Sequence, residues 1–134
     1  MDRGNERVAH LYHALHPAVL SLIDLSTRAA ARAGIPISVC GEMATNPLAV
    51  PLLVGLGIHE LSGTPSQVPL VKEIVRAVDS GEVAEDARRA LQAATVEEVQ
   101  AISAARLRDT GLLDHPDIGV WLRRIVEPIL GVDS

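Results

Sequence analysis

The amino-acid sequence predicts an α/β fold in which helices alternate with two short parallel strands. Apolar residues recur at helical spacing through most of the chain, two short apolar runs interrupt them, and glycine or proline stands at the joins. The resulting order of helix, strand, helix, strand and helix is typical of βα units around a parallel sheet. Two strands leave unpaired edges and cannot close a barrel, so we expect the chain to be a piece of a larger unit.

The first two elements are a helix and a strand. A helix is predicted over residues 17–33, because a proline stands in its first turn and Gly34 follows its last apolar position. The apolar run at 35–39 ends at Cys40 and is bounded by glycines. Its β-branched content favours a buried strand.

The next helix and strand are predicted to lie in the core. Asn46 is a helix-capping residue and Pro47 suits the first helical position. The stretch 48–56 is apolar on all sides and two glycines end it, which predicts a buried helix. Residues 58–62 form the second predicted strand.

Three further helices are predicted at 68–78, 83–93 and 96–107, the first of them with a continuous apolar face. Thr95 precedes the last of these helices, and Glu98 stands three residues later. This spacing predicts a capping box, in which each side chain bonds a free backbone N–H of the first turn.

The tail, residues 108–134, contains an amphipathic helix that we expect to start at Asp114-His115-Pro116 and to end or kink at Pro128. Its apolar stripe is formed by Ile118, Trp121, Leu122, Ile125, Val126 and Ile129. Such a stripe must be buried. Either the helix packs on its own domain, or it docks onto a partner chain.

Composition excludes several classes of protein. The chain has 134 residues, which allows one domain, and 12 basic against 17 acidic residues give a net charge of -5. This charge argues against nucleic-acid binding, and one Trp, one Tyr and no Phe leave almost no surface on which bases could stack. No apolar window is long enough to insert into a membrane.

The single cysteine, Cys40, excludes an internal disulfide framework and a zinc site of the paired-cysteine type. A reduced environment and a polar N-terminus without a signal-peptide pattern predict a cytoplasmic protein.

Cys40 is also the leading candidate for chemistry. It stands at the carboxyl end of the first predicted strand, where parallel α/β folds place reacting groups, and Gly41 after it permits close backbone approach. The alternative is a small, inert, buried hydrophobe.

Other residues are weaker candidates for a functional site. His10, His13 and His16 are spaced three apart, but no carboxylate or thiol ligand is near, and no metal site is predicted in this chain. The charged run at 82–89 is expected to be a solvated helix face.

The surroundings of Cys40 resemble the phosphoenolpyruvate-binding barrel of the phosphotransferase-system enzyme I family, the phosphoenolpyruvate-protein phosphotransferases. The matching motifs are Asp2-Arg3-Gly4-Asn5, Val39-Cys40-Gly41-Glu42-Met43-Ala44, Asn46-Pro47-Leu48-Ala49, Pro51-Leu52-Leu53-Val54-Gly55-Leu56-Gly57, Glu60-Leu61-Ser62 and Pro69-Leu70-Val71-Lys72-Glu73-Ile74. The resemblance covers about residues 2–103. It implies that residues 1–106 are the C-terminal part of a (β/α)8 barrel domain, containing two of its strands, and that 107–134 are a helical tail of unknown role.

The resemblance also implies a function. Enzymes of this family take the phosphoryl group of phosphoenolpyruvate onto their own histidine and pass it to a histidine phosphocarrier protein in sugar uptake. Cys40 matches the proton donor that converts the enolate to pyruvate, and Arg3 matches an arginine that binds the substrate phosphate. No histidine of this chain matches the phosphorylated one, and the ligands for the Mg²⁺ of the complete enzyme are expected upstream of Arg3.

As a fragment, the chain is expected to form a homodimer or to associate with the rest of the barrel. The alternative is a non-catalytic interaction module that pairs with a complete enzyme or with itself through its strand edge and the Trp121 helix.

Two departures from the family pattern affect the predicted site. Thr45 stands where glycine is common, which adds a side chain at a place of close backbone approach, and Gly63 stands where methionine is usual. We expect the second change to loosen the mouth of the site.

Overall fold

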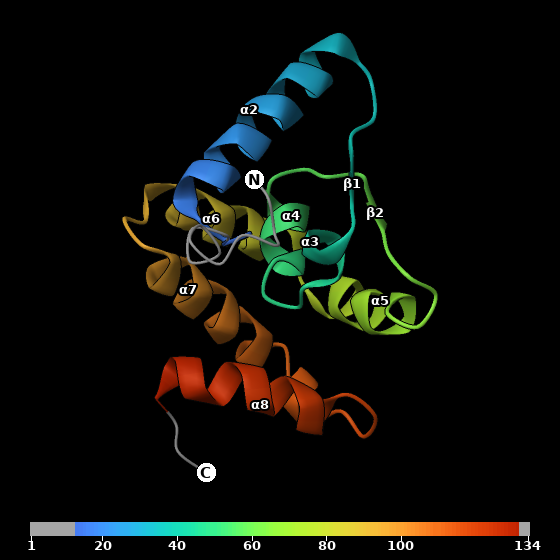
Figure 1. Ribbon diagram of the computed structural model, residues 1–134, viewed down its shortest axis with the longest axis vertical. Helices are drawn as coiled ribbons and strands as arrows, with labels where there is room; N and C mark the ends of the chain where they lie inside the picture. Colours follow the sequence, from blue (N-terminus) through green and yellow to red (C-terminus); the bar gives the residue numbers. More distant parts are fainter. Residues whose placement is uncertain (1–12, 132–134) are drawn as a thin grey trace, which may run out of the picture.

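The computed structural model describes residues 13–131, in which helices surround a pair of parallel strands (Figure 1). In chain order the elements are α2 (Pro17–Ala33), β1 (Ser38–Cys40), α3 (Glu42–Thr45), α4 (Val50–Gly55), β2 (Glu60–Ser62), α5 (Val68–Ala77), α6 (Ser80–Gln92), α7 (Val96–Asp109), the 3-10 turn η1 (Leu112–Asp114) and α8 (Gly119–Leu130). The predicted α/β class and the alternating order of elements are confirmed; a closed barrel is not formed by the described residues.

Helix α2 has the predicted limits. His16 caps its start, where the imidazole Nδ1 accepts a hydrogen bond from the backbone N–H of Ala18 at 3.1 Å. Gly34 ends the helix in the left-handed conformation, with φ of 66°. The helix contacts α6 and otherwise projects away from the remaining elements (Figure 1).

The strands β1 and β2 pair in parallel, with Ser38 opposite Glu60 and Cys40 opposite Ser62. Both are shorter than predicted. Pro36 interrupts the first apolar run, and a proline has no N–H to donate to a strand ladder.

One face of this two-stranded sheet is covered and the other is open. Val39 and Leu61 are half-buried and pack against the hydrophobic core, whereas the alternate positions on both strands are exposed. The strands lie side by side at the right margin of the molecule in Figure 1, with α3 and α4 beside them.

Helix α4 is the centre of the core. Val50, Pro51, Leu52 and Leu53 are buried, as predicted, and the helix is in contact with α3, α5, α6 and α7. Its predicted start is wrong: the regular helix begins at Val50, after a turn that Asn46 caps by accepting a hydrogen bond from the N–H of Leu48 at 3.0 Å.

Helix α6 begins earlier than predicted, at Ser80, because the Asp79 carboxylate accepts hydrogen bonds from the N–H groups of Gly81 and Glu82. At the start of α7 the Thr95 hydroxyl accepts from the Glu98 N–H at 3.2 Å. The Glu98 carboxylate returns to Ala94 rather than to Thr95, at 2.8 Å, so the predicted capping box forms with a shift of one residue.

The prediction of a wholly solvated charged face at 82–89 is wrong for Asp86. This residue is only 3% exposed and accepts a hydrogen bond from the Nε of Arg106 on α7 at 2.6 Å. The ion pair joins α6 to α7, a contact between residues far apart in sequence.

The C-terminal helix α8 begins at Gly119, later than predicted, because residues 112–118 form a 3-10 turn and a loop first. It packs on α7 and η1 through Leu122 and Val126, which is the first of the two alternatives. Trp121, which we placed on the buried stripe, is 41% exposed. Pro128 lies inside the helix and does not end it.

Candidate functional site

Cys40 is exposed at the carboxyl end of β1, directly opposite Ser62 at the end of β2. The alternative of a buried cysteine is therefore wrong. Because side chains alternate along a strand, Cys40 shares the open face of the sheet with Ser38, Glu60 and Ser62. The structure thus presents the thiol on the uncovered face, at the edge where parallel sheets place reacting groups.

Gly41 turns the chain sharply after the thiol. Its φ of 78° and ψ of -156° lie in a region that only glycine occupies readily. The turn lets the N–H of Gly41 donate to the carbonyl of Ser62 at 3.2 Å, which ties the ends of the two strands together. Glycine is therefore needed here for the chain to pass from β1 into α3.

A hollow of about 360 Å³ lies at these strand ends. It is lined by Gly41, Glu42, Ser62, Gly63, Thr64 and Gln67. Ser62, the cross-strand partner of Cys40, lies in this lining together with residues that follow the two strands, among them Gly41 directly after the cysteine; Cys40 itself is not among the lining residues.

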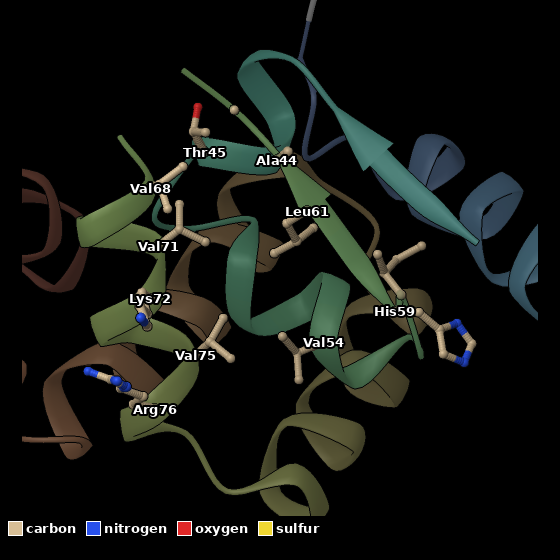
Figure 2. A pocket seen from close by; sticks show the side chains of 12 residues that line it. Ala44, Thr45, Val54, His59, Leu61, Val68, Val71, Lys72, Val75 and Arg76 are labelled. Carbon is tan, nitrogen blue, oxygen red and sulfur yellow. The ribbon is translucent and has the colours of Figure 1, made fainter. Parts of the chain in front are cut away.

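A larger groove of about 630 Å³ lies between β2 and α5, and Cys40 is not among its lining residues (Figure 2). Val68, Val71 and Val75 of α5 line one side, and Leu61 and Val54 line the opposite side and floor. Lys72 and Arg76 of α5 also line it. Sequence reasoning missed this groove, although α5 carries valines and cations at helical spacing; the free edge of β2 that completes it is visible only in the fold.

Several predicted residues fall elsewhere. Arg3 and His10 lie outside the described residues. His16 is occupied in capping α2, and residues 13–131 contain no group of three His, Cys, Asp or Glu side chains placed to hold a metal ion. Within the same range no helix has the length and apolarity needed to cross a membrane.

Comparison with known proteins gives a consistent result. The family model described as "PEP-utilising enzyme, PEP-binding domain" matches residues 1–80, which include both strands and α5. The chain is 38% identical over 112 residues to the Escherichia coli K12 protein named "Phosphoenolpyruvate-dependent phosphotransferase system", a match that covers 84% of this chain and 15% of that protein.

Two proteins named "Phosphoenolpyruvate-protein phosphotransferase" also match. The one from Cupriavidus necator is 49% identical over 73 residues, covering 54% of this chain and 12% of the relative. The one from Haloferax volcanii is 45% identical over 101 residues, covering 75% of this chain and 18% of the relative.

The matches thus span less than a fifth of these relatives' lengths. The family model, in contrast, covers more than half of this chain, and the motif around Cys40 lies inside the matched range. The chain belongs to the family of phosphoenolpyruvate-utilising enzymes and carries sequence of their phosphoenolpyruvate-binding domain.

Proposed function

We propose that this chain is the C-terminal part of the barrel of a phosphoenolpyruvate-dependent protein phosphotransferase. In the complete protein the P–O bond of phosphoenolpyruvate breaks and an N–P bond forms on a histidine outside this chain, from which a histidine phosphocarrier protein takes the phosphoryl group. The observation that carries the proposal is the exposed thiol of Cys40 at the carboxyl end of a parallel strand pair, beside a hollow.

The open face and edges of the sheet support the barrel assignment. Parallel sheets are normally covered on both faces, and here the face that bears Cys40 is exposed. The groove between β2 and α5 lies along the free edge of β2 and is largely apolar. A strand from the remainder of the barrel would pair with that edge and fill the groove.

In this proposal Cys40 supplies the proton that completes the reaction. Loss of the phosphoryl group leaves the enolate of pyruvate, and the proton moves from the Cys40 sulfur to the methylene carbon. A new C–H bond forms, pyruvate leaves, and water reprotonates the thiolate. A thiol on the open face of the sheet is accessible for both proton transfers.

Arg3 is proposed to bind the substrate phosphate, because a guanidinium offers a planar pair of donors to an anion. Mg²⁺ is the expected cofactor of the complete enzyme, with ligands that lie upstream of Arg3 and outside this chain, so we assign it no step here.

A chimera tests the proposal. This chain would replace the matching segment of the Escherichia coli relative, and phosphoenolpyruvate-dependent phosphorylation and pyruvate formation would be measured. We expect an active chimera in which Cys40→Ala lowers pyruvate turnover by about 100-fold or more and leaves the dissociation constant for phosphoenolpyruvate unchanged. Arg3→Ala should instead weaken substrate binding about tenfold or more.

Ser38→Ala is the matched control, since Ser38 lies on the same face of the same strand but at its opposite end. Full turnover in the Cys40→Ala chimera would remove the thiol from the mechanism. A folded chimera without any phosphoryl transfer would refute the assignment of this chain as a working part of the barrel.

A further inference from the structure

At position 63 a side chain is excluded by the neighbouring Thr45 and not by the backbone conformation of Gly63. Its φ lies outside the left-handed region, so its conformation is open to any residue. A Cβ at this position, however, would lie 2.2 Å from the Cγ2 methyl of Thr45, far inside van der Waals contact. The Thr45 methyl therefore occupies the space of the missing side chain.

Thr45 is held firmly in this position. It is the last residue of α3 and only 6% exposed. Its hydroxyl donates to the carbonyl of Glu42 at 3.4 Å, and a β-branched side chain has few alternative rotamers. The direction of the methyl group is thus fixed by the helix that starts directly after Cys40-Gly41.

This contact lies between the two hollows. Gly63 lines both of them, Thr45 lines the groove along β2, and the smaller hollow beside the thiol lies on the other side. The segment after Ser62 forms one wall of that smaller hollow, and Gly41 with Glu42 forms part of the other. Thr45 does not line the smaller hollow itself, but it belongs to the same short helix as Glu42, so its contact with Gly63 links the two walls.

We propose that Thr45 is a positioning residue: its methyl group, seated against the bare backbone of Gly63, fixes the segment after β2 relative to α3 and so sets the width of the hollow beside Cys40. Thr45 and Gly63 then act as a pair, in which a larger residue at 45 requires the smallest one at 63. In this proposal the Thr45 methyl fills the space at Gly63, so Gly63 does not by itself loosen the mouth of the site. The contact between Thr45 and Gly63 does not depend on the proposed function. Only the interpretation of the hollow as the place where substrate enters rests on it.

A double-mutant cycle on the full chain tests the pairing. Gly63→Ala should raise the unfolding equilibrium constant about tenfold or more, because its Cβ meets a buried methyl group. Thr45→Ser removes that methyl and keeps the hydroxyl, so Gly63→Ala should cost almost nothing when added to it. Thr45→Val keeps a methyl there and should not rescue Gly63→Ala.

Gly57→Ala is the control. Gly57 has a φ of 87°, and no atom lies within 4 Å of the position of its Cβ. The destabilisation by Gly57→Ala therefore comes from the backbone alone and should add to the destabilisation by Thr45→Ser. If Gly63→Ala costs as much in the Thr45→Ser variant as in the unaltered chain, the pairing is refuted. Should Gly63→Ala alone fail to fold, a folded double variant would still establish the rescue.

The positioning role has its own readout, the amide of Gly41. Its N–H donates to the carbonyl of Ser62, next to Gly63, so displacement of that segment should speed exchange of this amide. The Leu53 amide in buried α4 reports overall stability. We expect Gly63→Ala to accelerate Gly41 relative to Leu53 and Thr45→Ser to restore the ratio. An unchanged ratio would overturn the positioning role, and neither measurement depends on phosphoenolpyruvate.

Discussion

Glu97 lies in the first turn of α7, where two hydrogen-bond donors meet its carboxylate. Its own backbone N–H and the hydroxyl of Thr95 both donate to it, and these bonds lower the pKa of Glu97 from its ordinary value of 4.5. The position also suits an acidic residue, because free N–H groups at a helix N-terminus favour negative charge. The same threonine accepts from Glu98, so one hydroxyl organises two acidic residues.

Because the pKa of Glu97 is lowered, its protonation is expected to make the free energy of unfolding fall as the pH becomes acidic. A carboxyl group whose pKa is lower in the folded state stabilises the fold above its unfolded pKa, and this contribution disappears as pH falls through the folded pKa. Titration of the Glu97 side-chain carbon by NMR should give a midpoint below 4.5. Glu97→Gln should flatten the loss of stability between about pH 5 and pH 3, and a midpoint at or above 4.5 would contradict the assignment.

At the scale of elements, the helices α4 and α6 approach each other closely. A Cβ on Gly55 would lie 2.0 Å from the carbonyl oxygen of Val83, so the two helices meet backbone to backbone. This proximity explains why the short apolar helix can be buried so completely. The sequence marks Gly55 only as a residue near a helix end.

Gly55→Ala should therefore force α4 and α6 apart. We expect a loss of about 3 kcal/mol in the free energy of unfolding, measured by urea denaturation. Gly111→Ala serves for comparison: it has a φ of 78° and open space around it, so about 1 kcal/mol of backbone strain is its whole cost. Equal losses in the two variants would contradict the close packing of the helices.

The packing of α8 separates two neighbouring residues. Leu122 is fully buried against the core, whereas Trp121 is 41% exposed. Leu122→Ala should cost about 3 kcal/mol in the free energy of unfolding, and Trp121→Ala should cost much less despite the larger side chain. Thermal unfolding of both variants would measure this, and the reverse order would place the helix on its other face.

At the scale of the whole molecule, the stable core and the proposed chemistry are in different places. The core is formed by helices around α4, and Ser103 of α7 donates to the carbonyl of Leu48 at 2.6 Å to join distant parts of the chain. The strand pair that includes Cys40 lies at the margin of the molecule, and one face of the pair is open.

Hydrogen exchange should reveal this division. Amides in 38–40 and 60–62 are expected to exchange faster than those of α4 and of the buried part of α7, because the strands are exposed and α4 is not. Exchange measured by mass spectrometry on the full chain would test this. Equal protection would show that the open face of the sheet is covered in solution, by a second copy for instance.

The sequence by itself determined the order and type of the longer helices and of the two strands, because helix periodicity, caps and glycine stops are local properties; the short helix α3 and the 3-10 turn η1 were not predicted. It also singled out Cys40, since a strand end followed by glycine can be read from neighbouring residues. The ends of elements moved where a local competitor acted, as Asp79 did for α6 and Pro36 for β1.

Only the tertiary structure decided what depends on residues far apart in the chain. The burial of Asp86 requires Arg106, and the role of Gly63 requires Thr45. Neither pair has a periodic signal, because its partners lie on different elements and meet only when those elements pack. The exposure of Trp121 was likewise decided by which face of α8 packs on α7. A broad apolar stripe does not determine that face from the sequence alone.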